Sequence, residues 1–267
     1  LPTEVPTISD SIELRPVLPY PKLVHNYSTL PKMKLVCGLF GAGVVGGGVY
    51  ELLQRFKADD IFVKRICVKN LSKQRDFVID FEETSVTDVY EDILLDEEIN
   101  CVIELIGGVT DAKDIIFTSI SKGKHVVTAN KALIATHMTD IRLLLNLNPT
   151  VRFAYEAAVC GGIPIIHALQ TDFQYDNILK ISGIMNGTTN FILDKMDREN
   201  MTYNDVLKLA QDAGYAEADP TADVKGYDIQ SKLAILAKLC FGKDIPNKNE
   251  SGGILTYGIE KITKIDW

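Results

Sequence analysis

Residues 35–46 read LVCGLFGAGVVG, an apolar run that ends in the spacing GxGxxG. The run Lys34–Phe40 is typical of a buried strand, and Val44–Phe56 has the apolar spacing of a helix. A GxGxxG turn between a strand and a helix is the setting in which this motif binds the pyrophosphate of a dinucleotide. The motif favours dinucleotide binding over the alternative, a glycine-rich turn with a structural role alone.

Each glycine of this turn has its own expected role. Gly41 permits the tight turn, Gly43 lets the backbone approach a pyrophosphate, and Gly46 lets the helix pack closely on the strand. The helix N-terminus adds free N–H groups and a partial positive charge. The cofactor-binding residues expected from the motif are Gly41, Gly43, Val44, Val45 and Gly46.

Strand and helix patterns continue to alternate beyond the motif. Further strands are expected at Ile61–Val68, Cys101–Ile106 and His125–Thr128, and a helix at Asp111–Lys122. This order predicts a doubly wound, Rossmann-type parallel sheet with helices on both faces. We expect this α/β dinucleotide-binding domain to cover residues 34–148.

The pattern changes after Pro149, where a glycine- and proline-rich corner at Cys160–Pro164 begins an expected α+β second domain over residues 149–267. It contains expected helices at Ile165–Phe173, Asn190–Met196, Tyr203–Ala213 and Val224–Phe241, the last ending at Gly242, and an expected strand at Leu179–Met185. Residues 1–33 carry six prolines and no periodicity, which predicts a mobile leader or linker. Because the chain does not begin with Met, we expect a processed or excised piece of something longer.

Composition narrows the class of protein. The net charge of −8, from 28 basic and 36 acidic residues, disfavours nucleic acid and anionic membranes as partners. No apolar run reaches the roughly 18 residues of a membrane helix. The five cysteines are scattered without a CxxC pair, which predicts a reducing compartment and no zinc site. We therefore expect a cytoplasmic protein, or one of an organellar stroma if the leader is a processed remnant.

Positive charge follows the second expected strand. An NAD-selective domain usually has an acid about 20 residues after the glycine motif, where it binds the ribose 2′-hydroxyl. Lys69 and Asn70 occupy that place here, with Ser72, Lys73 and Arg75 behind them. This charge suits a 2′-phosphate and favours NADP(H) over NAD(H), and the alternative is a solvated basic turn.

Two other segments follow expected strands, at the edge where open parallel sheets bind ligands. Gly107 follows one strand, and Lys131 comes just after the next, beside Asn130. We count Gly107 and Lys131 as candidate cofactor-binding residues, although Lys131 could instead be a surface cation.

Glu156 stands alone among small and apolar residues, and a buried carboxylate needs a partner. Two solutions fit: a cation held by Glu156 and backbone carbonyls, or hydrogen bonds from the Gly161 and Gly162 amides.

Charge is concentrated in GYAEADPTADVKGYDIQSK, residues 214–232. Asp228 and Lys232 are four residues apart and therefore share one face of the expected helix. The helix is apolar on both sides and is expected to be buried, so that Lys232 can serve as a proton donor. A structural ion pair at the helix start is the alternative.

Several of these segments together resemble homoserine dehydrogenases, in that family's order: GLFGAGVVGGGVYELL, TANKALIA, YEAAVCGGIPII, ISGIMNGTTNFIL and AGYAEADPTADVKGYDIQSKLAILA. The resemblance covers Lys34–Trp267, and the last three motifs are specific, since other Rossmann dehydrogenases share only the first. It implies NAD(P)H-dependent interconversion of L-aspartate 4-semialdehyde and L-homoserine, in threonine, isoleucine and methionine biosynthesis. The second domain then binds the substrate and forms a homodimer.

The resemblance also implies individual roles. Lys232 corresponds to the family's acid/base lysine, Glu217 and Asp228 to its substrate-binding carboxylates, and Lys131 to a lysine beside cofactor and substrate. Gly214 corresponds to a glycine near the cofactor. A sodium-like cation site corresponds to Glu156, Val159, Gly161 and Ile163.

One departure leaves a rival open. Members of this family continue well past the segment resembling Tyr257–Thr263, so the second domain is expected to be incomplete, and a non-catalytic dinucleotide-binding or regulatory fragment is the alternative function. A dehydrogenase acting through a cysteine thioester is disfavoured, because Cys160 has no histidine within several residues to activate it.

Overall fold

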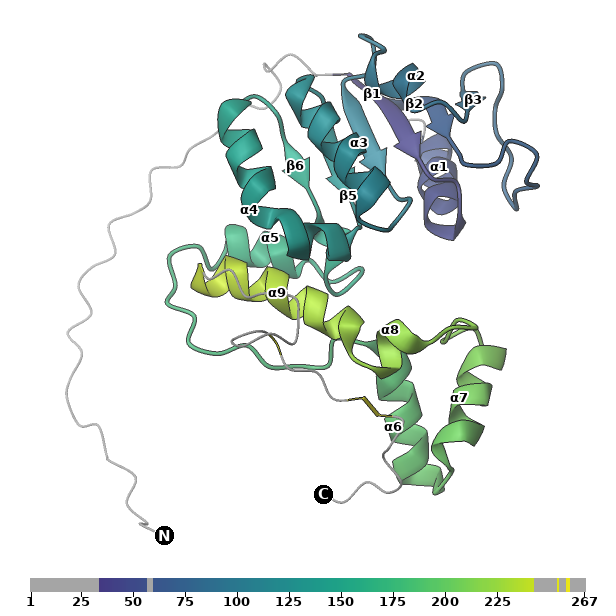
Figure 1. The fold of residues 1–267 in the computed structure, drawn as a ribbon, viewed down its shortest axis with the longest axis vertical. Coiled ribbons are helices and arrows are strands. Elements are labelled where there is room, and N and C mark those ends of the chain that lie inside the picture. Colours follow the sequence, from purple (N-terminus) through teal and green to yellow (C-terminus); the bar gives the residue numbers. More distant parts are fainter. Residues whose placement is uncertain (1–33, 57–59, 243–253, 255–257, 260–267) are drawn as a thin grey trace, which may run out of the picture. The chain divides into compact units, whose positions relative to one another are not determined.

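The computed structural model describes residues 34–56, 60–242, 254 and 258–259 (Figure 1). The expected leader over residues 1–33 lies outside this part of the chain.

A six-stranded sheet forms the first half of the described chain, with every strand pair parallel and the order β3-β2-β1-β4-β5-β6. Its strands are β1 (Leu35–Phe40), β2 (Ile61–Cys67), β3 (Ser85–Thr87), β4 (Cys101–Glu104), β5 (His125–Thr128) and β6 (Phe153–Ala154). The chain moves outward from β1 in one direction and then returns to β4 on its other side. The carboxyl ends of β1 and β4 are therefore the point where the strand order reverses, and ligands of open α/β sheets bind at that point.

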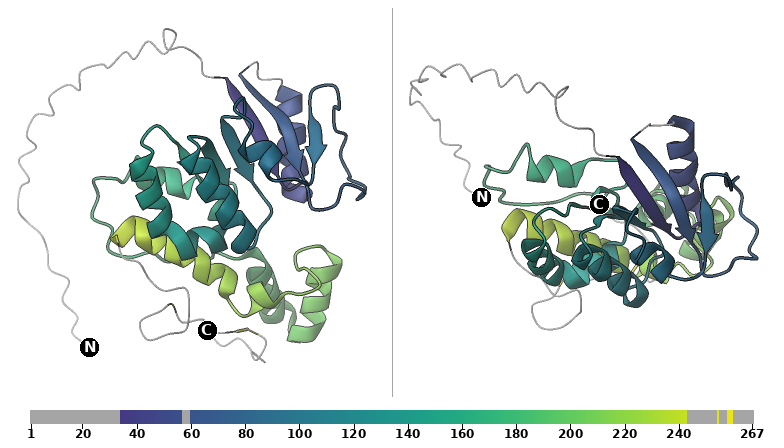
Figure 2. Two further views of the ribbon diagram at one scale, coloured as in Figure 1. Left: turned by 45° about the horizontal axis from the view of Figure 1, so that its top comes forward. Right: turned by 90° about the horizontal axis from the view of Figure 1, so that it is seen from above.

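Helices cover both faces of this sheet, as the alternating pattern predicted. Figure 2 shows α1 (Val44–Phe56) on one face and α3 (Thr110–Ser121) with α4 (Lys131–Leu147) on the other. Tyr50 of α1 packs with Leu39 and Ile66 in one apolar cluster, whereas Ile116 of α3 and Ile141 of α4 belong to another. The short helix α2 (Glu91–Leu94) precedes β4.

Helix α4 was not expected from the sequence. It begins after Asn130, whose side chain accepts a hydrogen bond from the Leu133 amide, and it buries Leu133, Ile134, Met138 and Ile141 at helical spacing. The apolar periodicity that places this helix was therefore present in the sequence. The sheet also extends past the expected domain boundary at residue 148, because β6 lies beyond it.

The described chain after β6 is helical. It contains a 3₁₀ turn (Glu156–Ala158) and the helices α5 (Ile165–Gln170), α6 (Gly187–Glu199), α7 (Tyr203–Asp212), α8 (Thr221–Val224) and α9 (Tyr227–Phe241). The expected long helix over Val224–Phe241 is divided, because Gly226 adopts a left-handed φ of 79° between α8 and α9. Gly242 ends α9 in the left-handed conformation, as predicted.

The strand expected at Leu179–Met185 was wrong, since the structure gives this segment no strand pairing. Leu179 and Ile184 are largely exposed in it. A strand needs a neighbour for its backbone N–H and C=O groups, and the described residues place none beside this segment.

Helix α9 packs against α4. Ile235 and Leu236 of α9 share an apolar cluster with Ile134 and Met138 of α4, and Tyr155 completes it. The two halves of the described chain therefore have a common core at this contact. None of the helices in the described ranges is long and apolar enough to cross a membrane.

The close packing of α1 generates a prediction. A methyl group at Gly46 would lie 2.1 Å from the Gly41 carbonyl oxygen. We therefore expect Gly46→Ala to lower the free energy of unfolding by about 1–3 kcal/mol, the usual cost of overpacking, as measured by denaturant titration. Gly48→Ala is the matched control, because Gly48 is exposed in the same helix with no atom near its would-be Cβ. That change should raise stability by about 0.5–1 kcal/mol, and equal effects of the two substitutions would contradict the packing argument.

Candidate active site

The glycine turn after β1 lies against the ends of two neighbouring strands. The Gly41 amide donates a hydrogen bond to the Cys67 carbonyl at the end of β2, with 2.9 Å between N and O. A Cβ at Gly41 would lie 2.7 Å from the Leu105 carbonyl oxygen, just beyond β4, and its φ of 97° is left-handed. Glycine is therefore required by contact and by backbone conformation at this position.

The beginning of α1 is open. Val44 and Val45 are exposed, and no atom lies within 4 Å of the position that a Cβ on Gly43 would occupy. The first turn of α1 also carries no acidic residue. Its N–H groups and partial positive charge can therefore receive a phosphate without a competing carboxylate on the helix itself.

The segment after β2 folds into a compact basic turn. The Arg75 guanidinium donates to the carbonyls of Lys73 and Asn70 at 3.0 Å each, and the Ser72 amide donates to the Asn70 side chain at 2.9 Å. Lys69 is exposed beside this turn. The positive charges predicted to bind a 2′-phosphate thus follow β2. This strand is the neighbour of β1, which leads into the glycine turn.

Asp228 lies between two lysines from different helices. Its Oδ1 is 3.1 Å from Lys131 Nζ, at the start of α4, and its Oδ2 is 2.6 Å from Lys232 Nζ, one turn further along α9. The Asp228 side chain is 9% exposed and that of Lys232 is 16%, whereas that of Lys131 is 38%. The structure thus adds Lys131 to the Asp228–Lys232 pair that the four-residue spacing predicted, and Lys131 is not an isolated surface cation.

Asn186 and the Met185 carbonyl complete this cluster, and neither was predicted from the sequence. The Asn186 amide nitrogen donates to Asp228 Oδ2 at 3.0 Å and to Asp223 Oδ1 at 2.7 Å. Lys232 Nζ also donates to the Met185 carbonyl at 2.7 Å. Asn186 caps α6 through the Thr189 amide, so the signal that could have located it is an Asn just before a predicted helix.

Opposing effects act on the Asp228 carboxylate. Burial by itself would raise its pKa, but hydrogen bonds from Lys232 and Asn186 and the charge of Lys131 outweigh burial and leave the pKa below its ordinary value. Asp228 is therefore ionised near neutral pH. An ionised carboxylate keeps both neighbouring amines attracted to it.

Other predicted residues are not part of this cluster. The Glu217 side chain is exposed, and no described residue pairs with its carboxylate. Gly214 has a φ of 76° just after α7, a helix-terminating position. Its neighbourhood is tied to α6 by the Thr188 hydroxyl, which donates to the Tyr215 carbonyl at 2.6 Å.

Glu156 finds a partner that was not among the two expected ones. Its Oε1 accepts from the Ile166 amide at 2.9 Å and its Oε2 from the His167 amide at 2.8 Å. The carboxylate thus caps the N-terminus of α5, and the amides of Gly161 and Gly162 do not serve this purpose. No cluster of three metal-binding side chains occurs within the described ranges.

The other expected cation ligands are backbone carbonyls in the turn between the 3₁₀ segment and α5. Val159 is buried, whereas Gly161 and Ile163 are exposed. Cys160 and Gly161 both have left-handed φ values, 59° and 58°. Two consecutive left-handed residues, one of them not glycine, mark a strained turn of the kind that often borders functional sites.

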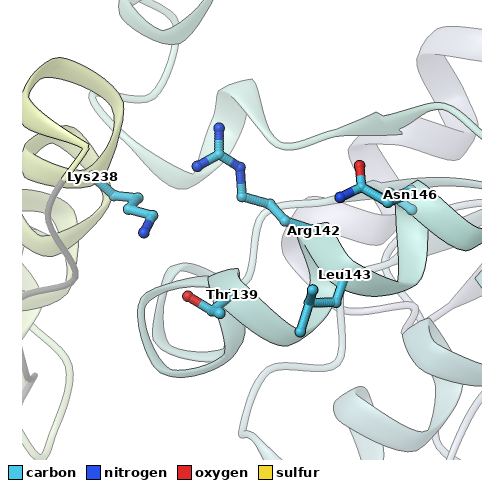
Figure 3. A pocket seen from close by; sticks show the side chains of 6 residues that line it. Thr139, Arg142, Leu143, Asn146 and Lys238 are labelled. Atoms are coloured by element: carbon cyan, nitrogen blue, oxygen red, sulfur yellow. The ribbon is translucent and has the colours of Figure 1, made fainter.

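A hollow of about 540 Å³ lies elsewhere, between α4 and α9. Its described lining is Thr139, Arg142, Leu143, Leu145, Asn146 and Lys238, none of them predicted site residues. Figure 3 shows Arg142 and Lys238 projecting from the two helices toward this space. The hollow therefore does not correspond to the predicted substrate site.

Family models match most of the chain. One described as "Homoserine dehydrogenase, NAD binding domain" covers residues 41–156, and one described as "Homoserine dehydrogenase" covers residues 164–267. The first range contains the whole glycine turn and Lys131, and the second contains Asn186, Asp228 and Lys232.

Individual homoserine dehydrogenases are similar over the same part of the chain. The enzyme from Bacillus subtilis is 40% identical over 236 residues, and that from Pseudomonas aeruginosa is 42% identical over 233 residues. Each alignment covers 86% of this chain and 53% or 52% of the relative, so the chain spans about half the length of the curated relatives it matches. A homoserine dehydrogenase structure from Thiobacillus denitrificans has a TM-score of 0.78 at 40% identity, covering 86% of this chain and 53% of that one.

The contacts of Asn186 generate a prediction. Asn186→Ala removes the amide that joins two carboxylates, and we expect a loss of about 1–3 kcal/mol in the free energy of unfolding at pH 7. The contribution of Asp228 is present above the unfolded-state pKa of about 3.9 and is lost as the pH falls through the lower folded-state pKa. The difference in free energy of unfolding between wild type and Asn186→Ala should therefore become smaller below about pH 4.

Denaturant titration at several pH values measures both effects. Asn148→Ala is the control, because the Asn148 side chain donates to a helix carbonyl, that of Leu144, and not to a carboxylate. A pH-independent loss in Asn186→Ala would show that its contacts with Asp228 contribute nothing to stability.

Proposed function

The chain belongs to the homoserine dehydrogenase family, and on that basis we propose that the intact protein reduces L-aspartate 4-semialdehyde to L-homoserine. The observation that carries the proposal is the Lys131–Asp228–Lys232 cluster, which combines a half-buried lysine with a buried carboxylate and a second cation. Lys131 follows β5, so the cluster adjoins the same edge of the sheet as the nucleotide turn after β1. The direct test is oxidation of NADPH in the presence of aspartate 4-semialdehyde.

In this proposal a bound nicotinamide cofactor supplies the hydride. Lys232 donates a proton to the carbonyl oxygen of the substrate. Asp228 and the Met185 carbonyl hold the ammonium group of Lys232 in place. Lys131, at the start of α4, offers its charge to the anionic side of the substrate. The protein thus contributes geometry and one proton, which a half-buried lysine with hydrogen-bonded neighbours can deliver.

Recognition of the substrate ammonium falls to carboxylates in the same proposal. The exposed carboxylate of Glu217 has no partner among the described residues, so it is available to a ligand. Asp228 is ionised, as the lowered pKa indicates. Two carboxylates suit an amino-acid substrate because charge-assisted hydrogen bonds to an ammonium group are strong.

For the cofactor we propose NADP(H) in preference to NAD(H). Lys69, Lys73 and Arg75 supply positive charge after β2, where an NAD-selective domain usually has an acid. The phosphates would lie on Gly41, Gly43, Val44, Val45 and Gly46, with Gly107 and Gly214 near the cofactor. The open helix start at Val44 is consistent with this placement.

A monovalent cation such as sodium is part of the proposal. Glu156 and the carbonyls of Val159, Gly161 and Ile163 would hold it, and these oxygen donors suit a hard cation. Both Glu156 oxygens already accept an amide, but each carboxylate oxygen has a second lone pair to offer. A bound cation would fix the strained turn at Cys160 and Gly161.

Wider aspects of the protein's role follow from the same proposal. The product would enter threonine, isoleucine and methionine biosynthesis, and the complete protein would be a homodimer acting in the cytoplasm or an organellar stroma, with no nucleic-acid or membrane partner. The exposed side chains of Leu179 and Ile184 support a homodimer interface at the segment Leu179–Met185. The free cysteines suit a reducing compartment. The rival, a non-catalytic dinucleotide-binding fragment, predicts cofactor binding without turnover.

Cofactor choice can be tested at one residue. Lys69→Glu places a carboxylate where NAD-selective domains bind the ribose 2′-hydroxyl. We expect the preference for NADPH over NADH to fall roughly 10-fold, which is the effect of one charge-assisted contact. Lys122→Glu makes the same charge change at the exposed end of α3 and should leave the preference unaltered. Steady-state kinetics with both cofactors measure the ratio. If wild type uses NADH as well as NADPH, the proposed preference is wrong.

The proton donor can be tested by replacing its side chain. We expect Lys232→Ala in the intact protein to lower kcat by roughly 10²- to 10⁴-fold, the usual range for loss of general acid/base catalysis, with little change in NADPH affinity. Lys232→Arg keeps the positive charge but is effectively never deprotonated, so it should restore stability and KM better than kcat. Lys208→Ala on the exposed face of α7 is the control. A Lys232→Ala variant that changes KM alone would make Lys232 a binding residue.

A further inference from the structure

Glu104, the last residue of β4, is a fully buried carboxylate that the proposed reaction does not use. Its Oε1 accepts hydrogen bonds from the amides of Ile106 and Gly107, at 3.0 and 3.3 Å, and its Oε2 accepts from the Thr128 hydroxyl at 2.6 Å. No lysine, arginine or histidine within the described ranges forms an ion pair with it. Neutral donors alone therefore hold this carboxylate.

These contacts continue to the start of α4. Thr128, the last residue of β5, lies directly opposite Glu104 in the parallel register. Its hydroxyl accepts from the Asn130 amide at 3.0 Å, and the Asn130 side chain donates to the Gly108 carbonyl at 2.7 Å. Asn130 also caps α4, whose first residue is Lys131. The result is a closed network from the loop after β4 to the lysine of the candidate site.

The hydrogen-bond pattern requires a carboxylate at position 104. An ionised carboxylate only accepts, whereas a glutamine must turn its NH₂ group toward the backbone amides or toward the Thr128 hydroxyl. The amides of Ile106 and Gly107 are donors and cannot accept. The Thr128 hydroxyl already accepts from Asn130, and it would lose the acceptor for its own proton.

The loop held in this way is unusual in conformation. Gly107 and Gly108 both have left-handed φ values, 73° and 71°. Glu104 accepts from the amide of Gly107, the first of these two residues, and from that of Ile106 before it, so the carboxylate holds the start of the left-handed turn. This loop follows β4, across from the glycine turn after β1, where the strand order reverses.

We propose that Glu104 is a positioning residue that holds the loop 105–108 and the start of α4 as one unit. Through Thr128 and Asn130 it sets the backbone from which Lys131 projects, so that cofactor affinity and the placement of Lys131 depend on the same buried carboxylate. The part of this inference that concerns turnover rests on the proposed dehydrogenase function. The part that concerns cofactor binding and backbone order does not.

Paired substitutions in the intact protein test the network. Glu104→Gln and Thr128→Val should each weaken NADPH binding about 10-fold in a fluorescence titration and lower kcat with aspartate 4-semialdehyde by at least a similar factor. Thr128→Ser keeps the hydroxyl and should recover most of both losses, which a purely steric role for Thr128 would not produce. If Glu104→Gln does not fold, the Val and Ser variants of Thr128 decide the question.

Thr84→Val is the matched control for lost stability. Thr84 is also a buried threonine, just before β3, and its hydroxyl both donates to the Val63 carbonyl and accepts from Tyr50. The Thr84→Val variant should have a lower melting temperature and an unchanged affinity for NADPH. If Thr128→Val behaves in the same way, with lower melting temperature and unaltered affinity and kcat, Glu104 has no positioning role.

Hydrogen exchange separates this inference from the proposed reaction. Glu104→Gln should speed exchange at the amides of Ile106 and Gly107 and, at the same time, at the Leu133 amide that Asn130 caps. Faster exchange in the loop with no change at the start of α4 would overturn the link between them. If wild type does not turn over aspartate 4-semialdehyde but both segments respond together, the proposed function fails and the positioning role stands.

Discussion

The candidate site depends on one buried carboxylate that has cations on both sides. Asp228 comes from α9 and Lys131 from α4, and the two helices pack through apolar contacts that involve Ile235 and Ile134. Apolar packing alone tolerates more than one arrangement, but a buried charge deprived of its partner is strongly destabilising. The Lys131–Asp228 ion pair therefore favours the arrangement of α4 and α9 in which Lys131 meets the Asp228–Lys232 pair of α9. Asn186 adds a second restraint, because it holds the carboxylate from the side of α6.

Close contacts between backbone atoms fix the glycine turn between β1 and α1. Gly41 leaves room for the Leu105 carbonyl, and Gly46 leaves room for the Gly41 carbonyl. These contacts bring α1 onto the sheet with its N-terminus at the point where the strand order reverses. The order of the strands then decides which loops meet there, namely those after β1 and β4.

The two regions meet at the start of α4. On the nucleotide side, Glu104 and Thr128 lead to Asn130, which caps the helix, and on the opposite side Lys131 reaches Asp228. A single helix N-terminus thus belongs to both hydrogen-bond systems. The proposed reaction requires cofactor and substrate to be held in one alignment, and the start of α4 connects the loop after β4 with Lys131, the lysine proposed to contact the substrate.

Local patterns along the chain were enough to predict most of the strands and helices that form the sheet domain and the pair of charged residues on α9. The glycine spacing placed β1 and α1, the alternation placed β2, β4, β5 and α3, and the four-residue spacing placed Asp228 and Lys232 on one face. These features depend on neighbours in the chain, so pattern and propensity reveal them. The helix α4 was also readable from its periodicity, although it was not expected.

Contacts between residues far apart in the chain could not be predicted in this way. No local pattern pairs Lys131 with Asp228, joins Glu104 to Thr128, or turns Glu156 toward the α5 amides instead of those of Gly161 and Gly162. The segment Leu179–Met185 shows the same limit in reverse, because its composition suits a strand but a strand exists only beside a partner. Side-chain chemistry can be read along the chain, whereas the partner of each group is fixed by packing that brings remote segments together.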